Sequence, residues 1–279
     1  MIGSEGLKGK IRNIANSKNL RSQEVLQMFF FERFLERLSK SKYKFNFVIK
    51  GGLLISSMIG IDNRTTMDMD TTIKGVPLKK EVIRTIISEI INVEVNDGIE
   101  FEITDISHIR EEDEYENFRV HLIANFDKIK NDMKIDITTG DAITPKEIEY
   151  LYPCMFQEES LRVLAYPLET ILAEKYESVI KRNISTTRMR DFYDLYNLYN
   201  LRKEEIDFDI LKQAIISTAN RRGSFSLMKQ AMEIIKDIKE DDYLKELWKV
   251  YLADNLYVGD LNFSETVKVV KIIAEKIAL

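Results

Sequence analysis

Patterns typical of strands occur only in the first half of this chain, whereas the second half has helical patterns alone. This difference between the two halves constrains the fold more than any other feature of the sequence. Before Pro145, predicted helices at residues 22–40, 53–59 and 79–92 alternate with predicted strands at 45–49 and 66–73, and three more predicted strands follow at 100–107, 118–126 and 133–139. After Pro145 we predict no further strand. Helical spacing begins at Pro167 and continues over residues 188–200, 208–219, 224–238, 241–253 and 264–278. We therefore predict a mixed α/β domain over residues 1–160 and an all-helical domain over residues 161–279.

The composition excludes several classes of protein. The chain has 279 residues, 44% of them hydrophobic and 31% charged, so it has enough apolar surface for a core and is not a disordered chain. The single cysteine, Cys154, excludes an internal disulfide and favours a reducing, cytoplasmic compartment. Two histidines, His108 and His121, leave little room for zinc chemistry. Because no apolar run approaches the roughly 20 residues of a membrane helix, we expect no contact with membranes.

A pair of glycines marks the first candidate site. Lys50-Gly51-Gly52 stands between the predicted strand 45–49 and the predicted helix 53–59. Because glycine has no Cβ, backbone N–H groups there can approach an anion, and a helix N-terminus adds a favourable partial charge. The motif is compatible with phosphate binding, although a Gly-Gly turn is structural in most proteins.

Three carboxylates in strand-like segments form the second candidate site. Alternation along residues 66–73 places Asp68 and Asp70 on one face of a strand, about 7 Å apart. Asp136 lies between two isoleucines in a later strand, where a carboxylate is costly unless it has partners. If the two strands are neighbours, the three side chains converge. Mg²⁺ or Mn²⁺ bound to nucleotide phosphates is the natural partner of such a group, because these ions prefer oxygen ligands.

The predicted helical domain contains a third group of polar residues. Lys175 follows Leu172-Ala173-Glu174, and Arg190-Asp191-Phe192-Tyr193-Asp194 follows 15 positions later. Asp191 and Asp194 share a helix face at i, i+3 spacing. From Lys175 to Lys203 there are seven bases and three acids, an excess that suits contacts with phosphates. A network of ion pairs that holds two helices together is the alternative interpretation.

Taken together, these motifs resemble the nucleotidyltransferase superfamily related to DNA polymerase β. The resemblance rests on Lys50-Gly51-Gly52, on Arg64-x-Thr66-x-Asp68-x-Asp70, and on Lys-Ile-Asp136-Ile, in that order. With Glu174-Lys175 and Arg190-Asp191-x-x-Asp194-Leu, the chain is similar more narrowly to the AbiEii/AbiGii toxin family. It differs from some relatives at Leu53, where they carry Ser or Thr directly after the glycines.

The resemblance implies an α+β fold, in which a nucleotidyltransferase-type mixed sheet with flanking helices is followed by a helical C-terminal domain. It also implies a toxin of a bacterial toxin–antitoxin or abortive-infection system that transfers NMP from an NTP to an RNA 3′ end, with tRNA favoured, and that has a cognate antitoxin, in direct contact or not. By position, Asp68, Asp70 and Asp136 would bind the metals, and Asp136 would also accept the proton of the attacking hydroxyl. The residues that would contact the NTP are Lys50, Gly51, Gly52, Arg64, Thr66 and Lys175. Lys175 with Asp191 or Asp194 would complete the catalytic set.

Two other functions stay open at this point. The same chemistry can act on a protein side chain or on a small molecule, or the chain can be a non-catalytic nucleotide-binding protein that keeps the fold. The three intact carboxylates speak against the non-catalytic alternative. A labelled NTP separates transfer to a protein from transfer to RNA, because it shows which of the two molecules receives the nucleotide.

Overall fold

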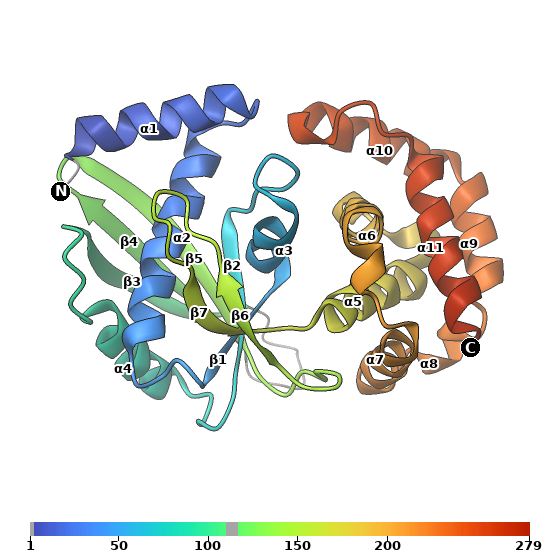
Figure 1. Ribbon diagram of the computed structural model, residues 1–279. Coiled ribbons are helices and arrows are strands. Elements are labelled where there is room, and N and C mark those ends of the chain that lie inside the picture. The colour runs from blue at the N-terminus through green and yellow to red at the C-terminus, as the bar shows by residue number, and fades with distance from the viewer. Residues whose placement is uncertain (1–2, 110–116) are drawn as a thin grey trace. The chain divides into compact units, whose positions relative to one another are not determined.

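The computed structural model describes residues 3–109 and 117–279 of the chain. The chain divides into two compact units, one formed by residues 1–140 and 148–165 and the other by residues 141–147 and 166–279. Figure 1 shows the first unit in blue, green and yellow-green and the second mostly in yellow to red. The predicted domain boundary between residues 160 and 161 stays a prediction, because compactness alone does not establish independent folding.

The first unit is built on a mixed sheet whose strands follow the order β3-β4-β5-β2-β1-β7-β6 in the described residues. β1 pairs in parallel with β7 and β2 in parallel with β5, while the other neighbouring strands are antiparallel. The strands are β1 (Phe47–Lys50), β2 (Asp68–Ile73), β3 (Glu100–His108), β4 (Phe118–Phe126), β5 (Ile129–Thr138), β6 (Ile148–Tyr152) and β7 (Leu161–Ala165). The predicted α+β class is therefore confirmed.

The prediction that strand structure ends at Pro145 was wrong. β6 and β7 both follow Pro145, and β7 lies directly beside β1 within the sheet. Each strand has only five residues, so its alternation is short. The sequence of β7, Leu-Arg-Val-Leu-Ala, also runs into the apolar residues that open the next helix, which hides the change of period.

One face of the sheet forms the core of this unit. Along β5, buried Met133, Ile135 and Ile137 alternate with exposed or half-buried polar residues, as expected for a strand with one buried face. Helices α2 (Ser22–Lys40) and α4 (Lys80–Ile91) pack on the apolar face, and Gln27 of α2 accepts a hydrogen bond from Asn131 of β5 at 2.8 Å. α1 (Ser4–Ser17) packs on α2, and α3 (Gly51–Ile59) packs against β1 and β2.

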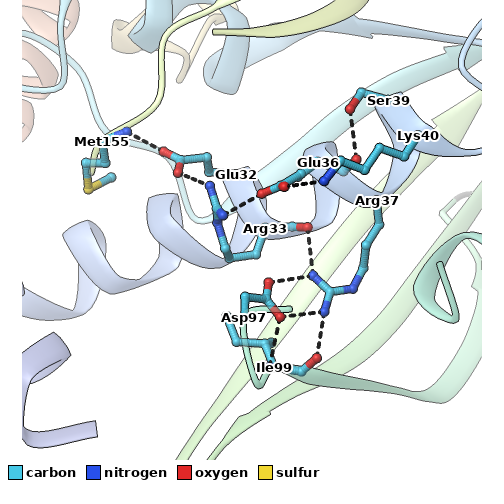
Figure 2. A network of polar contacts seen from close by, with 9 residues as sticks. All are labelled: Glu32, Arg33, Glu36, Arg37, Ser39, Lys40, Asp97, Ile99 and Met155. Atoms are coloured by element: carbon cyan, nitrogen blue, oxygen red, sulfur yellow. Dashed lines mark hydrogen bonds and ion pairs between the residues drawn. The ribbon is translucent and has the colours of Figure 1, made fainter. Parts of the chain in front are cut away.

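Helix α2 carries charged side chains inside the core, a feature that its apolar periodicity did not predict. Figure 2 shows Arg33 between Glu32 and Glu36, and Arg37 bound through two hydrogen bonds, both 2.8 Å long, to the carboxylate of Asp97. Glu32, Arg33, Glu36 and Arg37 are all buried. Burial raises the pKa of Glu32 above its ordinary value, although the positive charge of Arg33 opposes that shift. Pairing of the charges offsets part of the cost of their desolvation.

The second unit is helical. Its helices are α5 (Leu168–Arg182), α6 (Met189–Arg202), α7 (Phe208–Arg221), α8 (Phe225–Met228), α9 (Ala231–Glu240), α10 (Asp242–Asp254) and α11 (Phe263–Ile277). The helix predicted over residues 224–238 is two helices, because Gln230 leaves helical geometry with φ −101° and ψ 11°. Among residues 3–109 and 117–279, no helix combines the length and the apolar character needed to cross a lipid bilayer.

Candidate active site

The polar face of the sheet brings the three predicted carboxylates onto neighbouring strands. β2 and β5 run in parallel, with Asp70 opposite Asp136 and Asp68 opposite Lys134. On β2, Met69 between the two aspartates is buried in the core, so the aspartates face the other way and are half-buried. The alternation of a strand with one apolar face therefore gathers Asp68, Asp70 and Asp136 on the opposite, polar face.

The first glycine of the Gly-Gly turn lies directly against this group. Gly51 begins α3 at the end of β1 and has φ +63°, a conformation that favours glycine. A Cβ atom at this position would lie 2.1 Å from Oδ2 of Asp70. The glycine thus leaves room for the Asp70 carboxylate, which ties the Gly-Gly turn to the aspartates of β2.

The second glycine makes a similar close approach to the segment before β2. A Cβ on Gly52 would lie 2.8 Å from Oγ1 of Thr66 and 2.9 Å from Nη2 of Arg64. The Thr66 hydroxyl donates a hydrogen bond of 3.0 Å to the backbone carbonyl of Asp68, and the buried Arg64 donates to the carbonyl of Thr65. Arg64 and Thr66 therefore hold the backbone that enters β2, and their predicted contact with the NTP stays a prediction.

Lys50, the third predicted member of the turn, lies in the same cross-strand row as the aspartates. It is the register partner of Asp70 on the adjacent strand β1, and its Nζ donates a hydrogen bond of 2.8 Å to Oγ1 of Thr138. A lysine so close to two carboxylates reduces the repulsion between them. Its ammonium group therefore reaches across β2 to β5, the strand that carries Asp136.

Arg119 is also part of this site, although none of the sequence motifs includes it. It lies on β4 directly opposite Asp136, and its Nε and Nη2 donate hydrogen bonds of 2.7 and 2.8 Å to the two carboxylate oxygens of Asp136. These hydrogen bonds raise the pKa of Arg119 above its ordinary value, against an opposing effect of partial burial, and the charges of Asp136, Asp68 and Asp70 raise it further. All three carboxylates therefore act electrostatically on one guanidinium.

A signal for Arg119 was present in the sequence. The turn between β4 and β5 is the two-residue loop Asp127-Lys128, in which Asp127 has φ 52°, and it pairs Phe126 with Ile129. Seven residues away from the turn, β4 carries Arg119 and β5 carries Asp136, so the turn places these two residues opposite each other. The strand after this turn was predicted to begin at residue 133. Because the turn was therefore not located, the pairing of residues between the two strands could not be predicted.

The donor atoms suit a cation that brings other ligands with it. Within residues 3–109 and 117–279, no three Asp, Glu, His or Cys side chains are placed to enclose a metal ion by themselves. Mg²⁺, however, usually binds to one or two carboxylates and completes its shell with waters and substrate phosphates. Asp68 and Asp70, on one strand face beside a turn with no room for a Cβ, have the chemistry for that mode of binding.

The predicted residues of the helical domain lie in the second unit, where they form a cluster of their own. Nζ of Lys175 on α5 lies 2.7 Å from Oδ1 of Asp191 and 3.2 Å from Oδ2 of Asp194, both on α6. Ser178 donates a hydrogen bond of 2.8 Å to the other oxygen of Asp191. Asp191 and Asp194 are buried, whereas the Lys175 side chain is 20% exposed. The cluster joins α5 to α6, as the structural interpretation of the motif expects.

Comparisons with known proteins bear on the fold and the family. The model of a family described as the nucleotidyl transferase AbiEii toxin of type IV toxin–antitoxin systems matches residues 33–269. A protein from Helicobacter pylori whose crystal structure is described as that of a nucleotidyltransferase is 17% identical, with a TM-score of 0.54, and the similarity covers 92% of this chain and 96% of that chain. A second Helicobacter pylori structure is 16% identical, also with a TM-score of 0.54, over 92% of this chain and 93% of its own. No curated protein matches the sequence significantly. The predicted nucleotidyltransferase fold is confirmed by these structures.

Proposed function

This chain belongs to the AbiEii family of nucleotidyltransferase toxins from type IV toxin–antitoxin systems, and on that premise we propose that it transfers NMP from an NTP to the 3′ end of an RNA, with tRNA as the acceptor. One observation carries the proposal. The carboxylates of Asp70 and Asp136 are on register partners of adjacent strands, and the Asp70 side chain lies where a Cβ of Gly51 would be. A triphosphate at the Gly-Gly turn would therefore lie next to the carboxylates.

The proposed reaction is a single displacement at phosphorus. The oxygen of the acceptor 3′-hydroxyl forms a bond to the α-phosphorus of the NTP, the bond from that phosphorus to the bridging oxygen of the β-phosphate breaks, and pyrophosphate leaves. Asp136 accepts the proton of the attacking hydroxyl. Asp68 and Asp70 hold Mg²⁺ or Mn²⁺, which when bound neutralises charge on the phosphates and favours ionisation of the hydroxyl.

The binding of the NTP is assigned to the glycine turn. The first N–H groups of α3 have no partner within the helix, and with the helix dipole they favour a negatively charged group. Lys50 directly precedes the turn and is also proposed to contact the NTP, for which its ammonium group would leave Thr138. Arg64 and Thr66 lie close to Gly52 and are also proposed to contact the NTP at this turn.

The helical unit is assigned contacts with phosphates of the NTP or the RNA. Lys175 is the proposed phosphate ligand, and Asp191 and Asp194 hold its ammonium group in a defined position. The basic excess from Lys175 to Lys203 supports RNA as the acceptor, because phosphate contacts depend on positive charge and weaken with salt. An NTP and an RNA as substrates also support a cytoplasmic location, and a toxin of this family implies a cognate antitoxin.

The proposal is tested by following an α-labelled NTP. Purified protein is incubated with Mg²⁺, total cell RNA, total cell protein and each of the four labelled NTPs in turn. We expect label on a small RNA of tRNA size, released pyrophosphate, and no transfer by D68A, which should fold normally because Asp68 is half-buried at a strand end. Label on protein would assign a different acceptor. No turnover with any acceptor would favour a non-catalytic nucleotide-binding protein.

A further inference from the structure

Arg119 holds Asp136 in one orientation. Two hydrogen bonds, 2.7 Å from Nε and 2.8 Å from Nη2, reach the two oxygens of the same carboxylate. Paired parallel hydrogen bonds fix both the rotation and the plane of a carboxylate, which a single bond does not. The side chain of Asp136 is only 13% exposed and that of Arg119 is 33% exposed, so both are partly shielded from water.

Asp136 needs such a contact because of its other neighbour. On the opposite side from Arg119, its register partner is Asp70, on a strand about 5 Å away. Two carboxylates at that separation repel each other, and the repulsion favours rotation of one of them away. The row of register partners Arg119, Asp136, Asp70 and Lys50 crosses four strands and flanks two negative charges with two positive ones.

The contact leaves Asp136 able to react. A carboxylate has about four lone-pair sites, and the guanidinium uses one on each oxygen. Each oxygen therefore keeps a second site for a proton donor such as a hydroxyl. Arg119 contacts neither Gly51 nor Gly52 in the described hydrogen bonds, and the glycine turn lies two strands beyond Asp136.

We infer that Arg119 is a positioning residue for the transfer reaction: its guanidinium holds the Asp136 carboxylate in the orientation that accepts the proton of the attacking hydroxyl. The inference rests on the proposed function, because it assigns Asp136 that role. It requires the planar, two-point geometry of arginine, so a positive charge alone is insufficient. Lysine keeps the charge but has neither the plane nor the paired donors.

The test compares R119Q, R119K and a control, K130A, by steady-state kinetics with labelled NTP and RNA. Lys130 lies on the same face of β5, six residues from Asp136, and is exposed, so K130A removes a positive charge without touching the contact. We expect kcat to fall about 100-fold in R119Q, since misplacement of a reacting group by about 1 Å costs that much. The KM of R119Q for the NTP should change by less than about twofold. The kcat of R119K should stay at least about tenfold below that of wild type. K130A should have wild-type kcat and KM.

Crystal structures of wild type and R119Q provide a readout that does not need turnover. We expect the Asp136 carboxylate of R119Q to be rotated from its wild-type orientation while the strands keep their register. An inactive wild type would refute the proposed function and with it the catalytic role of Asp136, whereas the structures would still decide whether Arg119 sets the orientation of the Asp136 carboxylate. The inference is overturned if Asp136 is unmoved in R119Q, if R119K has wild-type kcat, or if KM rises as much as kcat falls. If R119Q does not fold, R119K decides the question by the same measurements.

Discussion

Replacement of Gly51 by alanine tests how closely the glycine turn and the carboxylates are joined. The new Cβ would lie 2.1 Å from Oδ2 of Asp70, and ordinary van der Waals contact begins at 3.4 Å, so the carboxylate would have to retreat by about 1.3 Å. The Cβ would also lie 2.8 Å from the Cβ of Asp70, which rotation of that side chain does not relieve. Some displacement of β1 or β2 is therefore expected as well.

The magnitude follows from two separate penalties. Alanine at φ +63° costs roughly 1–2 kcal/mol in backbone energy, and overpacking adds roughly 1–3 kcal/mol. The matched control is G75A in the same unit, where φ is +73° and the new Cβ would make only an ordinary contact, 3.5 Å from Asn46. We expect G51A to lower the free energy of unfolding by about 2–5 kcal/mol and G75A by about 1–2 kcal/mol.

The assays are urea denaturation and transfer of labelled nucleotide. We expect G51A to lose about 100-fold in kcat because Asp70 is displaced by more than 1 Å, whereas G75A keeps wild-type kcat. The double variant G51A/D70A should recover part of the lost stability but none of the activity, because it removes the two shortest contacts together with the carboxylate. A G51A variant as stable and as active as G75A would refute the reasoning.

Three further predictions concern other parts of the molecule. K175M removes the ammonium partner of buried Asp191 and Asp194, so it should lower the free energy of unfolding, measured by urea denaturation, by about 2–4 kcal/mol. The control K181M, at an exposed site on the same helix, should change it by less than about 0.5 kcal/mol. Equal effects of the two variants would contradict the role of Lys175 in stabilising the two carboxylates. Burial raises the pKa of Glu32, so its charged form destabilises the folded state at pH values above that pKa. Wild type should therefore gain stability relative to E32Q as the pH falls toward 4.5. A stability difference between wild type and E32Q that does not change with pH would contradict a raised pKa of Glu32. Burial raises the pKa of Cys154 to about 11, so only about a thousandth of it is thiolate at pH 8, and its alkylation by iodoacetamide should be slow there and accelerate up to pH 11; rapid alkylation at pH 8 would contradict this.

Local periodicity was sufficient to predict many elements of the fold. The helix predicted over residues 22–40 is α2, Ser22–Lys40, and the strand predicted over residues 118–126 is β4, Phe118–Phe126. The alternation around Met69 also predicted correctly that Asp68 and Asp70 share a face, because side-chain parity along a strand is a local property. The short strands β6 and β7 were missed because five residues give too little alternation beside apolar helical sequence.

The cross-strand relationships depended on information that is not local. Asp70 and Asp136 are 66 positions apart, and their pairing follows from the insertion of β5 beside β2, which no periodicity encodes. The contact between Arg119 and Asp136 depends on the Asp127-Lys128 turn, which sets the register of β4 and β5. Charged residues buried on α2, such as Arg33 and Arg37, resemble solvent-exposed residues in sequence, because only their distant partners make burial tolerable.

The central claim is that Asp68, Asp70 and Asp136 act as one catalytic centre for nucleotide transfer, and non-additivity tests it most directly. The measurement is kcat of the transfer reaction for D70A, D136A and the double variant D70A/D136A, each shown to be folded. Residues that act as a unit lose nearly all function when either is removed, so we expect both single variants and the double variant to have the same residual rate. Losses that multiply in the double variant, or a single variant with wild-type kcat, would contradict the account.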